Sequence, residues 1–162
     1  MRNVNIMSGI PGSGKTTYIK YMAKENDVIM NRDEYRKDLH KRMGKSVGSN
    51  SKIEYQYWIN HINSQLRRPN DIWIDQTTIG IGSLKKLLKY ISIKDTDRII
   101  VHLIDTPLDV CIERNLKRND DEAVAVDVLS HMYANHIENA IDEMSVSKLR
   151  YPFLIKMIIY KG

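Results

Sequence analysis

The sequence predicts a single α/β domain of three layers, in which a five-stranded parallel sheet lies between helices. Short apolar runs of a few residues alternate with longer amphipathic segments along the whole chain. The runs lack the polar alternation of a half-exposed strand, so we expect helices to cover both faces of the sheet. No repeat, low-complexity tract or linker divides the 162 residues, and the domain is therefore expected to span residues 1–162.

Each strand and helix of this prediction corresponds to one apolar run or one amphipathic segment. Strands are predicted at residues 4–7, 28–30, 72–74, 98–104 and 153–160. Helices are predicted at residues 16–24, 33–42, 52–66, 83–91, 109–117 and 126–144. Residues 44–51 are rich in glycine, serine and asparagine and predict a surface loop, and residues 119–122 predict a polar connector.

The composition indicates a globular protein with an anionic partner. Hydrophobic residues make up 42% of the chain, and no apolar run approaches the ~20 residues that cross a bilayer. The first residues run directly into a predicted strand, so no signal peptide is expected. Cys111 is the only cysteine, which excludes an internal disulfide and fits a cytoplasmic setting. The net charge of +5 suits a polyanion such as ATP or a nucleic acid.

A complete phosphate-binding loop lies between the first strand and the first helix. Residues 9–16 read Gly-Ile-Pro-Gly-Ser-Gly-Lys-Thr. The glycines allow a tight turn that points backbone N–H groups at phosphate oxygens, and the helix that follows directs its positive end at the same oxygens. Lys15 is expected to reach the terminal phosphates, and the Thr16 hydroxyl is expected to ligate Mg²⁺. The loop therefore predicts a nucleoside triphosphate site, for which the expected contacts come from Gly12, Ser13, Gly14, Lys15, Thr16 and Thr17.

Two charged residues directly follow the second strand. In an open α/β sheet, ligands bind beyond the carboxyl ends of the strands, so Asp33 lies where an acceptor substrate is expected. Asp33 and Arg36 share a helix face at i, i+3 spacing. The carboxylate can accept a proton from an attacking hydroxyl, and the arginine can bind an anionic group. A helix cap with a surface ion pair explains the same pattern equally well.

Three further charged positions have both a functional and a structural interpretation. Asp75 ends the third strand, where it can act as a Walker-B-like carboxylate, position a substrate group, or simply cap the next segment. Arg114 and Arg118 share a helix face at i, i+4 spacing, as in a basic lid that neutralises a transferring phosphoryl group. A solvated basic face is the alternative. His102 lies in an apolar strand and is expected to be a satisfied core or edge histidine.

Together these motifs resemble the kinase domain of the phage-type polynucleotide 5′-hydroxyl kinases, the family of the T4 enzyme. The blocks that carry the resemblance are residues 9–16, Asn-Arg-Asp-Glu-Tyr-Arg at 31–36, Ile-Asp-Gln-Thr at 74–77, Arg-Asn-Leu-Lys-Arg at 114–118, and residues 124–133. The phosphate-binding loop is common to many kinases, whereas the second and last blocks are much more specific.

The resemblance implies a role for each matched residue. Lys15 and Thr16 would bind the phosphates of ATP and Mg²⁺, and Arg114 and Arg118 would be lid arginines near those phosphates. Lys15, Asp33 and Arg118 would be catalytic, with Asp33 as the general base for the acceptor hydroxyl. The resemblance also implies an acceptor site in which Arg36 holds a 3′ phosphate, and whose other residues are Asp75, Val124 and Val128.

The implied substrate is the 5′-hydroxyl end of DNA or RNA, in a phage-type repair enzyme that acts in the host cytoplasm. Three departures from the family pattern are Gln76-Thr77 after Asp75, Ala125 in place of proline, and an acidic connector at 120–122. Acidic residues repel a polynucleotide, which favours a smaller acceptor such as a nucleoside, nucleotide or modified base. A nucleic-acid-binding ATPase that transfers nothing is a third possibility, although such a protein has no need of an acceptor site.

Overall fold

The computed structural model describes residues 1–44, 51–77, 82–118, 123–134, 136 and 155–161. The predicted loop at 44–51, the connector at 119–122 and the second half of the helix at 126–144 lie mostly or wholly outside these ranges. Within them the strands are β1 (Asn3–Ser8), β2 (Val28–Asn31), β3 (Ile72–Asp75), β4 (Arg98–Asp105) and β5 (Ile155–Lys161). The helices are α1 (Lys15–Met22), α2 (Arg32–Met43), α4 (Ser51–Gln65), α5 (Ser83–Tyr90) and α6 (Leu108–Leu116), and a further helical stretch covers residues 126–134.

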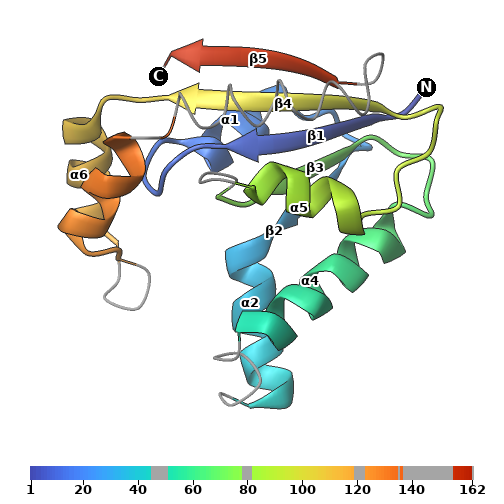
Figure 1. The fold of residues 1–162 in the computed structure, drawn as a ribbon, viewed down its shortest axis with the longest axis horizontal. Helices are drawn as coiled ribbons and strands as arrows, with labels where there is room; N and C mark the ends of the chain where they lie inside the picture. Colours follow the sequence, from blue (N-terminus) through green and yellow to red (C-terminus); the bar gives the residue numbers. More distant parts are fainter. Residues whose placement is uncertain (45–50, 78–81, 119–122, 135, 137–154, 162) are drawn as a thin grey trace.

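The five strands form one parallel sheet in the order β2-β3-β1-β4-β5 (Figure 1). In the register of the central pair, Ile6 lies beside Ile74, so β1 and β3 end next to each other. The sequence prediction of a five-stranded parallel sheet is confirmed, and the boundaries differ from the prediction by at most two residues where they can be compared. None of the described helices combines the length and the apolar character that a membrane crossing would require.

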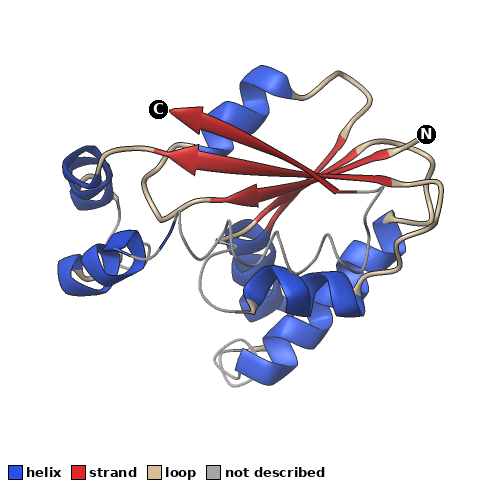
Figure 2. Ribbon diagram, turned by 45° about the horizontal axis from the view of Figure 1, so that its top comes forward, coloured by secondary structure: helices blue, strands red, loops and turns tan. Residues whose placement is uncertain are grey.

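Helices cover both faces of the sheet, as the uninterrupted apolar runs predict (Figure 2). On one face, Val4 and Ile6 of β1 pack with side chains of α4 and α5, among which Trp58, Ile62 and Leu87 are fully buried. The opposite face carries a smaller cluster, in which Met7 of β1 and Trp73 of β3 pack against Tyr18 and Ile19 of α1. Burial of both faces produces the three-layer sandwich.

A short polar chain crosses the α1 side of the core. The buried His102 imidazole receives a hydrogen bond on Nδ1 from the Tyr18 hydroxyl at 2.9 Å, and its Nε2 donates to Asn5 Oδ1 at 2.8 Å. The Asn5 amide nitrogen donates to the Ile72 carbonyl at 3.3 Å, so the Asn5 oxygen is the acceptor that fixes this tautomer. Burial lowers the pKa of His102 to about 4 and keeps the ring neutral. His102 is therefore a satisfied core histidine, as the sequence predicts.

Candidate active site

The phosphate-binding loop has a backbone that depends on its glycines. Gly12 and Gly14 adopt positive φ angles of +82° and +96°, which side chains other than glycine rarely adopt. A Cβ atom on Gly12 would also lie 2.6 Å from the carbonyl oxygen of Cys111, in α6. On the far side of the loop, Ile10 packs with Cys111 and Leu129, so the loop rests against α6 and the 126–134 helix.

Lys15 lies inside the loop, where it is nearly buried. Its Nζ donates to the carbonyls of Gly9 at 2.8 Å and Ile10 at 3.1 Å. Burial lowers the pKa of Lys15 from 10.5 to about 8, and the nearby positive charge of Arg118 lowers it further, while Asp75 and Asp33 oppose the shift. The ammonium therefore lies among its own backbone carbonyls and near two carboxylates that belong to different elements.

Asp75 links the loop to the end of β3. Its Oδ2 atom accepts a hydrogen bond from the Thr16 hydroxyl at 2.7 Å and another from the Asn31 side-chain amide at 3.0 Å. The carboxylate is buried, whereas Thr16 and Thr17 are exposed at the start of α1. The next two residues, Gln76 and Thr77, both line the cleft described below, and Gln76 also accepts a hydrogen bond from the Trp58 indole at 2.7 Å.

Asn31 also starts the helix that carries the predicted acceptor residues. Its side-chain oxygen accepts a hydrogen bond from the Glu34 backbone N–H at 3.0 Å and caps α2. Arg36 lies one turn from Asp33, and their charged groups are 3.5 Å apart. The ion pair of the alternative interpretation is thus present, on the side of α2 that faces the phosphate-binding loop.

Glu54 is a buried carboxylate that sequence reasoning did not single out. It holds Arg32 through two hydrogen bonds, of 3.2 and 2.7 Å, and lies 3.7 Å from the Nε atom of Arg36. Because Glu54 comes from α4, its carboxylate ties α4 to Arg32 at the start of α2, 22 residues earlier in the chain. A single glutamate on a polar helix gives no sequence signal that distinguishes it from a surface charge.

The opposite wall of the site comes from α6 and the segment after it. Arg114 donates to the Gly12 carbonyl at 3.2 Å, and Arg118 lies close enough to Lys15 to influence its pKa. The buried Asn115 donates to the Val124 carbonyl at 2.6 Å and accepts from the Val124 N–H at 2.9 Å. This pair of bonds ties Val124 to α6, and Asn115 is a second residue that the sequence did not reveal.

These walls enclose a cleft of about 670 Å³. It contains most of the predicted site residues, namely Gly12, Gly14, Lys15, Thr16, Thr17, Asp33, Arg36, Asp75, Arg114, Arg118 and Val124. Two predicted residues are not part of its lining. Ser13 is buried beneath the loop, where its carbonyl accepts a hydrogen bond from Thr106 at 2.7 Å, and Val128 is exposed on the 126–134 helix, whose Met132 contributes to the cleft instead.

The fold and the cleft define a P-loop kinase-like domain. The sequence matches the AAA domain family over residues 4–139, and the chain belongs to that family. Among curated proteins, no sequence matches the chain significantly.

Solved structures of several kinds share the fold. A chain of the Pnkp1/Rnl/Hen1 RNA repair complex is similar with a TM-score of 0.70 and 20% identity, over 87% of this chain and 46% of that one. A sugar kinase from Janibacter sp. HTCC2649 is similar with a TM-score of 0.61 and 16% identity, over 99% of this chain and 85% of the other. A protein of the PezAT toxin–antitoxin system of Streptococcus pneumoniae is similar with a TM-score of 0.66 and 21% identity, over 99% of this chain and 67% of the other. At these identities the likeness concerns the fold alone, and this chain spans less than half of the RNA repair protein's chain.

Proposed function

We propose that the protein transfers the terminal phosphoryl group of ATP to the 5′-hydroxyl end of a nucleic acid. The observation that carries the proposal is that Asp33 and Arg36 face the same cleft as Lys15 and Thr16. A protein that only binds or hydrolyses ATP needs no second charged pair opposite its phosphate-binding loop. The cleft therefore suits two substrates, one on each wall.

The donor side of the cleft is built for phosphates. The loop amides and the N-terminus of α1 would hold the phosphate chain of ATP, and Lys15 would leave its carbonyl partners to bind the terminal phosphates. Arg114 and Arg118 on the opposite wall would stabilise the charge that develops on the transferred group.

The acceptor side supplies a base and an anion-binding group. In the proposed reaction the acceptor hydroxyl oxygen forms a bond to the γ-phosphorus while the bond from that phosphorus to the bridging oxygen of ADP breaks. Asp33 takes the proton that the hydroxyl loses, and Arg36 holds a phosphate on the 3′ side of the same nucleotide. ADP is the leaving group, so atoms and charges balance without any further reactant.

The residues present fit Mg²⁺, which enzymes of this fold use with ATP. The Thr16 hydroxyl and the Asp75 carboxylate lie 2.7 Å apart at the edge of the phosphate-binding loop and are hard oxygen ligands. The described residues contain no group of three or more acidic, histidine or cysteine side chains suited to a metal, in line with an ion that binds mainly through phosphates and water. When bound, Mg²⁺ would neutralise part of the phosphate charge. Asp75 thus fits a donor-side role better than the acceptor role that the resemblance implies.

A nucleic acid is the preferred acceptor because of the residues at 31–36 and 124–133, the basic charge of the chain, and the fold shared with a chain of an RNA repair complex. A small acceptor is the second candidate. The specific observation in its favour is the likeness to a sugar kinase that matches nearly the whole length of both chains.

Transfer of the labelled γ-phosphate of ATP tests the proposal. We expect label on DNA or RNA oligonucleotides with a 5′-hydroxyl end and none on matched oligonucleotides that carry a 5′-phosphate. ATP binding without transfer to any nucleic-acid end would contradict the nucleic-acid assignment. Label on a sugar or nucleoside would establish the second candidate, and hydrolysis without a phosphorylated product would indicate an ATPase.

A further inference from the structure

Helix α2 separates two cavities and presents a different charge to each. Beyond Asp33, the residues that α2 turns toward the active-site cleft are Arg36, Lys37 and His40. The spacing from 33 through 36 and 37 to 40 keeps them on one helix face. Every side chain on this face after the proposed base can therefore bind an anion.

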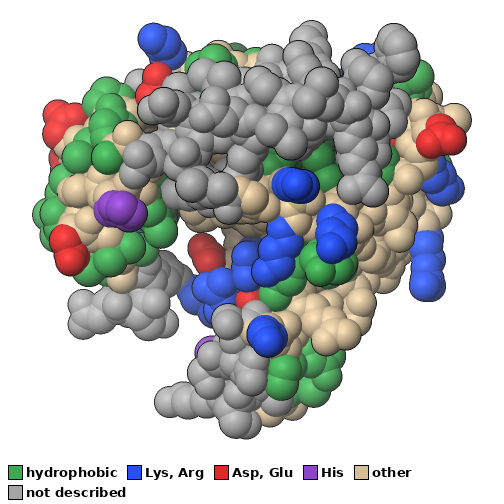
Figure 3. Space-filling model, viewed as in Figure 1, with side chains coloured by type: hydrophobic (Ala, Val, Ile, Leu, Met, Phe, Trp, Pro, Cys, Tyr) green, Lys and Arg blue, Asp and Glu red, His purple; other side chains and the backbone are tan. Residues whose placement is uncertain are grey.

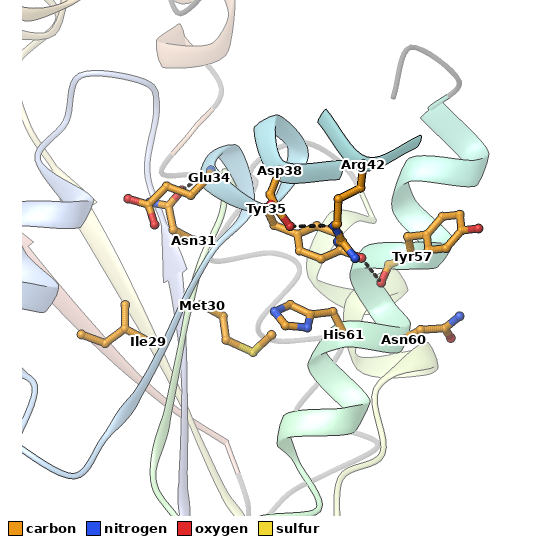
Figure 4. A pocket seen from close by; sticks show the side chains of 10 residues that line it. All are labelled: Ile29, Met30, Asn31, Glu34, Tyr35, Asp38, Arg42, Tyr57, Asn60 and His61. Atoms are coloured by element: carbon orange, nitrogen blue, oxygen red, sulfur yellow. Dashed lines mark hydrogen bonds and ion pairs between the residues drawn. The ribbon is translucent and has the colours of Figure 1, made fainter. Parts of the chain in front are cut away.

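The second cavity, of about 620 Å³, lies between α2, β2 and α4 (Figure 4). Here α2 contributes Glu34 and Asp38, and the one basic residue of α2 on this side, Arg42, is paired with Asp38 at 2.9 Å. Tyr35 stacks on His61 of α4 with ring centroids 4.6 Å apart and donates from its hydroxyl to the Tyr57 carbonyl at 3.2 Å. The carboxylates disfavour an anion in this cavity, so an anionic ligand of α2 belongs on the cleft face.

His40 has a hydrogen-bonding group that the described part of the protein leaves unused. Its Nε2 atom is buried and has no partner among the described residues, although the side chain lines the cleft. A buried polar group without a partner is unfavourable, so an acceptor in the cleft that pairs with Nε2 is favoured. Lys37 is exposed beside it and supplies a positive charge.

Lys37 is exposed and His40 is half-buried, and both line the cleft. In Figure 3, basic side chains gather beside a hollow that separates the part of the chain with α6 from the part with α2 and α4. A strand whose 5′ end lies at Asp33 can leave the cleft along α2. The rise from Arg36 to His40 is about 6 Å. One nucleotide step of an extended strand is longer than the ~3.4 Å axial rise per nucleotide in a duplex, so the next phosphate along the strand lies in the direction of His40.

We infer that Lys37 and His40 form a second phosphate subsite, which binds the phosphodiester one nucleotide beyond the phosphate at Arg36. The subsite makes an oligonucleotide a better acceptor than a mononucleotide, and it rests on the proposed kinase function. Lys37 contributes charge and His40 donates a hydrogen bond from Nε2 to a non-bridging phosphate oxygen. Neither residue reaches the transferred phosphoryl group.

Two dinucleotides that differ by one phosphate test this subsite. The dinucleotide dTpT carries only the phosphate proposed to lie at Arg36, whereas dTpTp carries a second phosphate at its 3′ end. With the wild-type protein we expect kcat/KM for dTpTp to exceed that for dTpT by about tenfold. This ratio is the contribution expected of one charge-assisted hydrogen bond to the additional phosphate. In the double variant Lys37→Gln, His40→Gln this ratio should fall close to one.

Lys41→Gln is the matched control, because it removes one positive charge from α2 at a residue that lines neither cavity. Its ratio should stay at the wild-type value. Equal kcat/KM for both dinucleotides with the wild-type protein, or an unchanged ratio in the double variant with unaltered ATP affinity, would overturn the subsite. The single variant His40→Gln provides the test if the double variant fails to fold. If neither dinucleotide nor any longer 5′-hydroxyl oligonucleotide accepts the phosphoryl group, the proposed function itself is refuted.

Discussion

The Thr16 hydroxyl donates a 2.7 Å hydrogen bond to the buried carboxylate of Asp75, which lies 59 residues further along the chain. Thr16 follows β1 through the phosphate-binding loop, and Asp75 ends β3, the parallel neighbour of β1. Since both strands end at the same edge of the sheet, the two oxygens meet without any long loop. The bond therefore joins the two motifs on which the proposed donor site depends.

The contact between Thr16 and Asp75 predicts that the variant Asp75→Asn loses the gain in ATP affinity that Mg²⁺ provides. Replacing the carboxylate by an amide keeps its shape but removes the charge that favours Mg²⁺. We expect ATP affinity without Mg²⁺ to change little, while the gain in affinity on adding Mg²⁺ falls about tenfold or more. Calorimetric titration with and without the metal measures both quantities.

The control for Asp75 is Asp95→Asn, which changes an exposed carboxylate in the turn before β4. The Mg²⁺-dependent gain should be unaffected by that change. An Asp75→Asn protein that keeps the full gain would place the metal elsewhere.

Asp33 predicts a loss of turnover without a loss of ATP binding. The variant Asp33→Asn cannot take the proton of the acceptor hydroxyl, so kcat should fall by about 10²–10⁴. ATP affinity should stay near the wild-type value because Asp33 lies on α2, in the wall of the cleft where we propose that the acceptor binds. Glu34→Gln, on the opposite face of α2, is the matched control and should leave kcat unchanged. Full activity of Asp33→Asn would remove this residue as the base.

Much of the fold, and the position of the phosphate-binding loop in it, could be predicted from the sequence, because each depends on residues close together in the chain. The phosphate-binding loop needs consecutive residues of fixed type, and β1 and α1 flank it as the motif requires. Asp33, Arg36 and Asp75 could be placed near the loop because parallel strands end at one edge of the sheet. Strand order could not be predicted, since it depends on how helices pack across the whole sheet.

The residues that support the site could not be predicted, because each acts through a partner far away in the chain. Glu54 matters through Arg32, 22 residues away, and Asn31 orients Asp75 across 44 residues. The role of Val128 came from the family resemblance, which does not say which side of its helix meets the cleft. In the structure Met132 lines the cleft and Val128 is exposed.

Asn115 predicts a change in both stability and ATP affinity. The variant Asn115→Ala leaves the N–H and C=O groups of Val124 without their partner, which should lower the free energy of unfolding by about 2 kcal/mol. The Michaelis constant for ATP should rise, because the same contact holds Val124, which lines the cleft. Urea unfolding and steady-state kinetics measure the two effects.

Asn63 supplies a matched control for Asn115, since it also bonds a carbonyl and an N–H group, those of Tyr90 and Ser92. These bonds are exposed, so water replaces them in Asn63→Ala. That variant should lose little stability and keep its Michaelis constant. If Asn115→Ala and Asn63→Ala have similar Michaelis constants for ATP, Asn115 stabilises the fold and does not affect ATP binding.

Lys15 predicts a pH dependence of ATP binding. In the free protein its pKa is about 8, lowered from 10.5 mainly by burial, while bound phosphates favour the charged amine and raise that pKa. Below about pH 8 the amine is already charged, and affinity should not depend on its titration. Above that pH, binding must take up a proton, so the association constant should fall by up to about tenfold per pH unit. Titrations of ATP binding between about pH 7 and 9.5 measure this fall in the association constant.

The exposed Lys20 supplies the control. The variant Lys20→Met should keep the fall in ATP affinity at high pH, whereas Lys15→Met should bind ATP weakly at every pH, with no such fall. A flat wild-type profile would mean that Lys15 does not contact the phosphates as a cation.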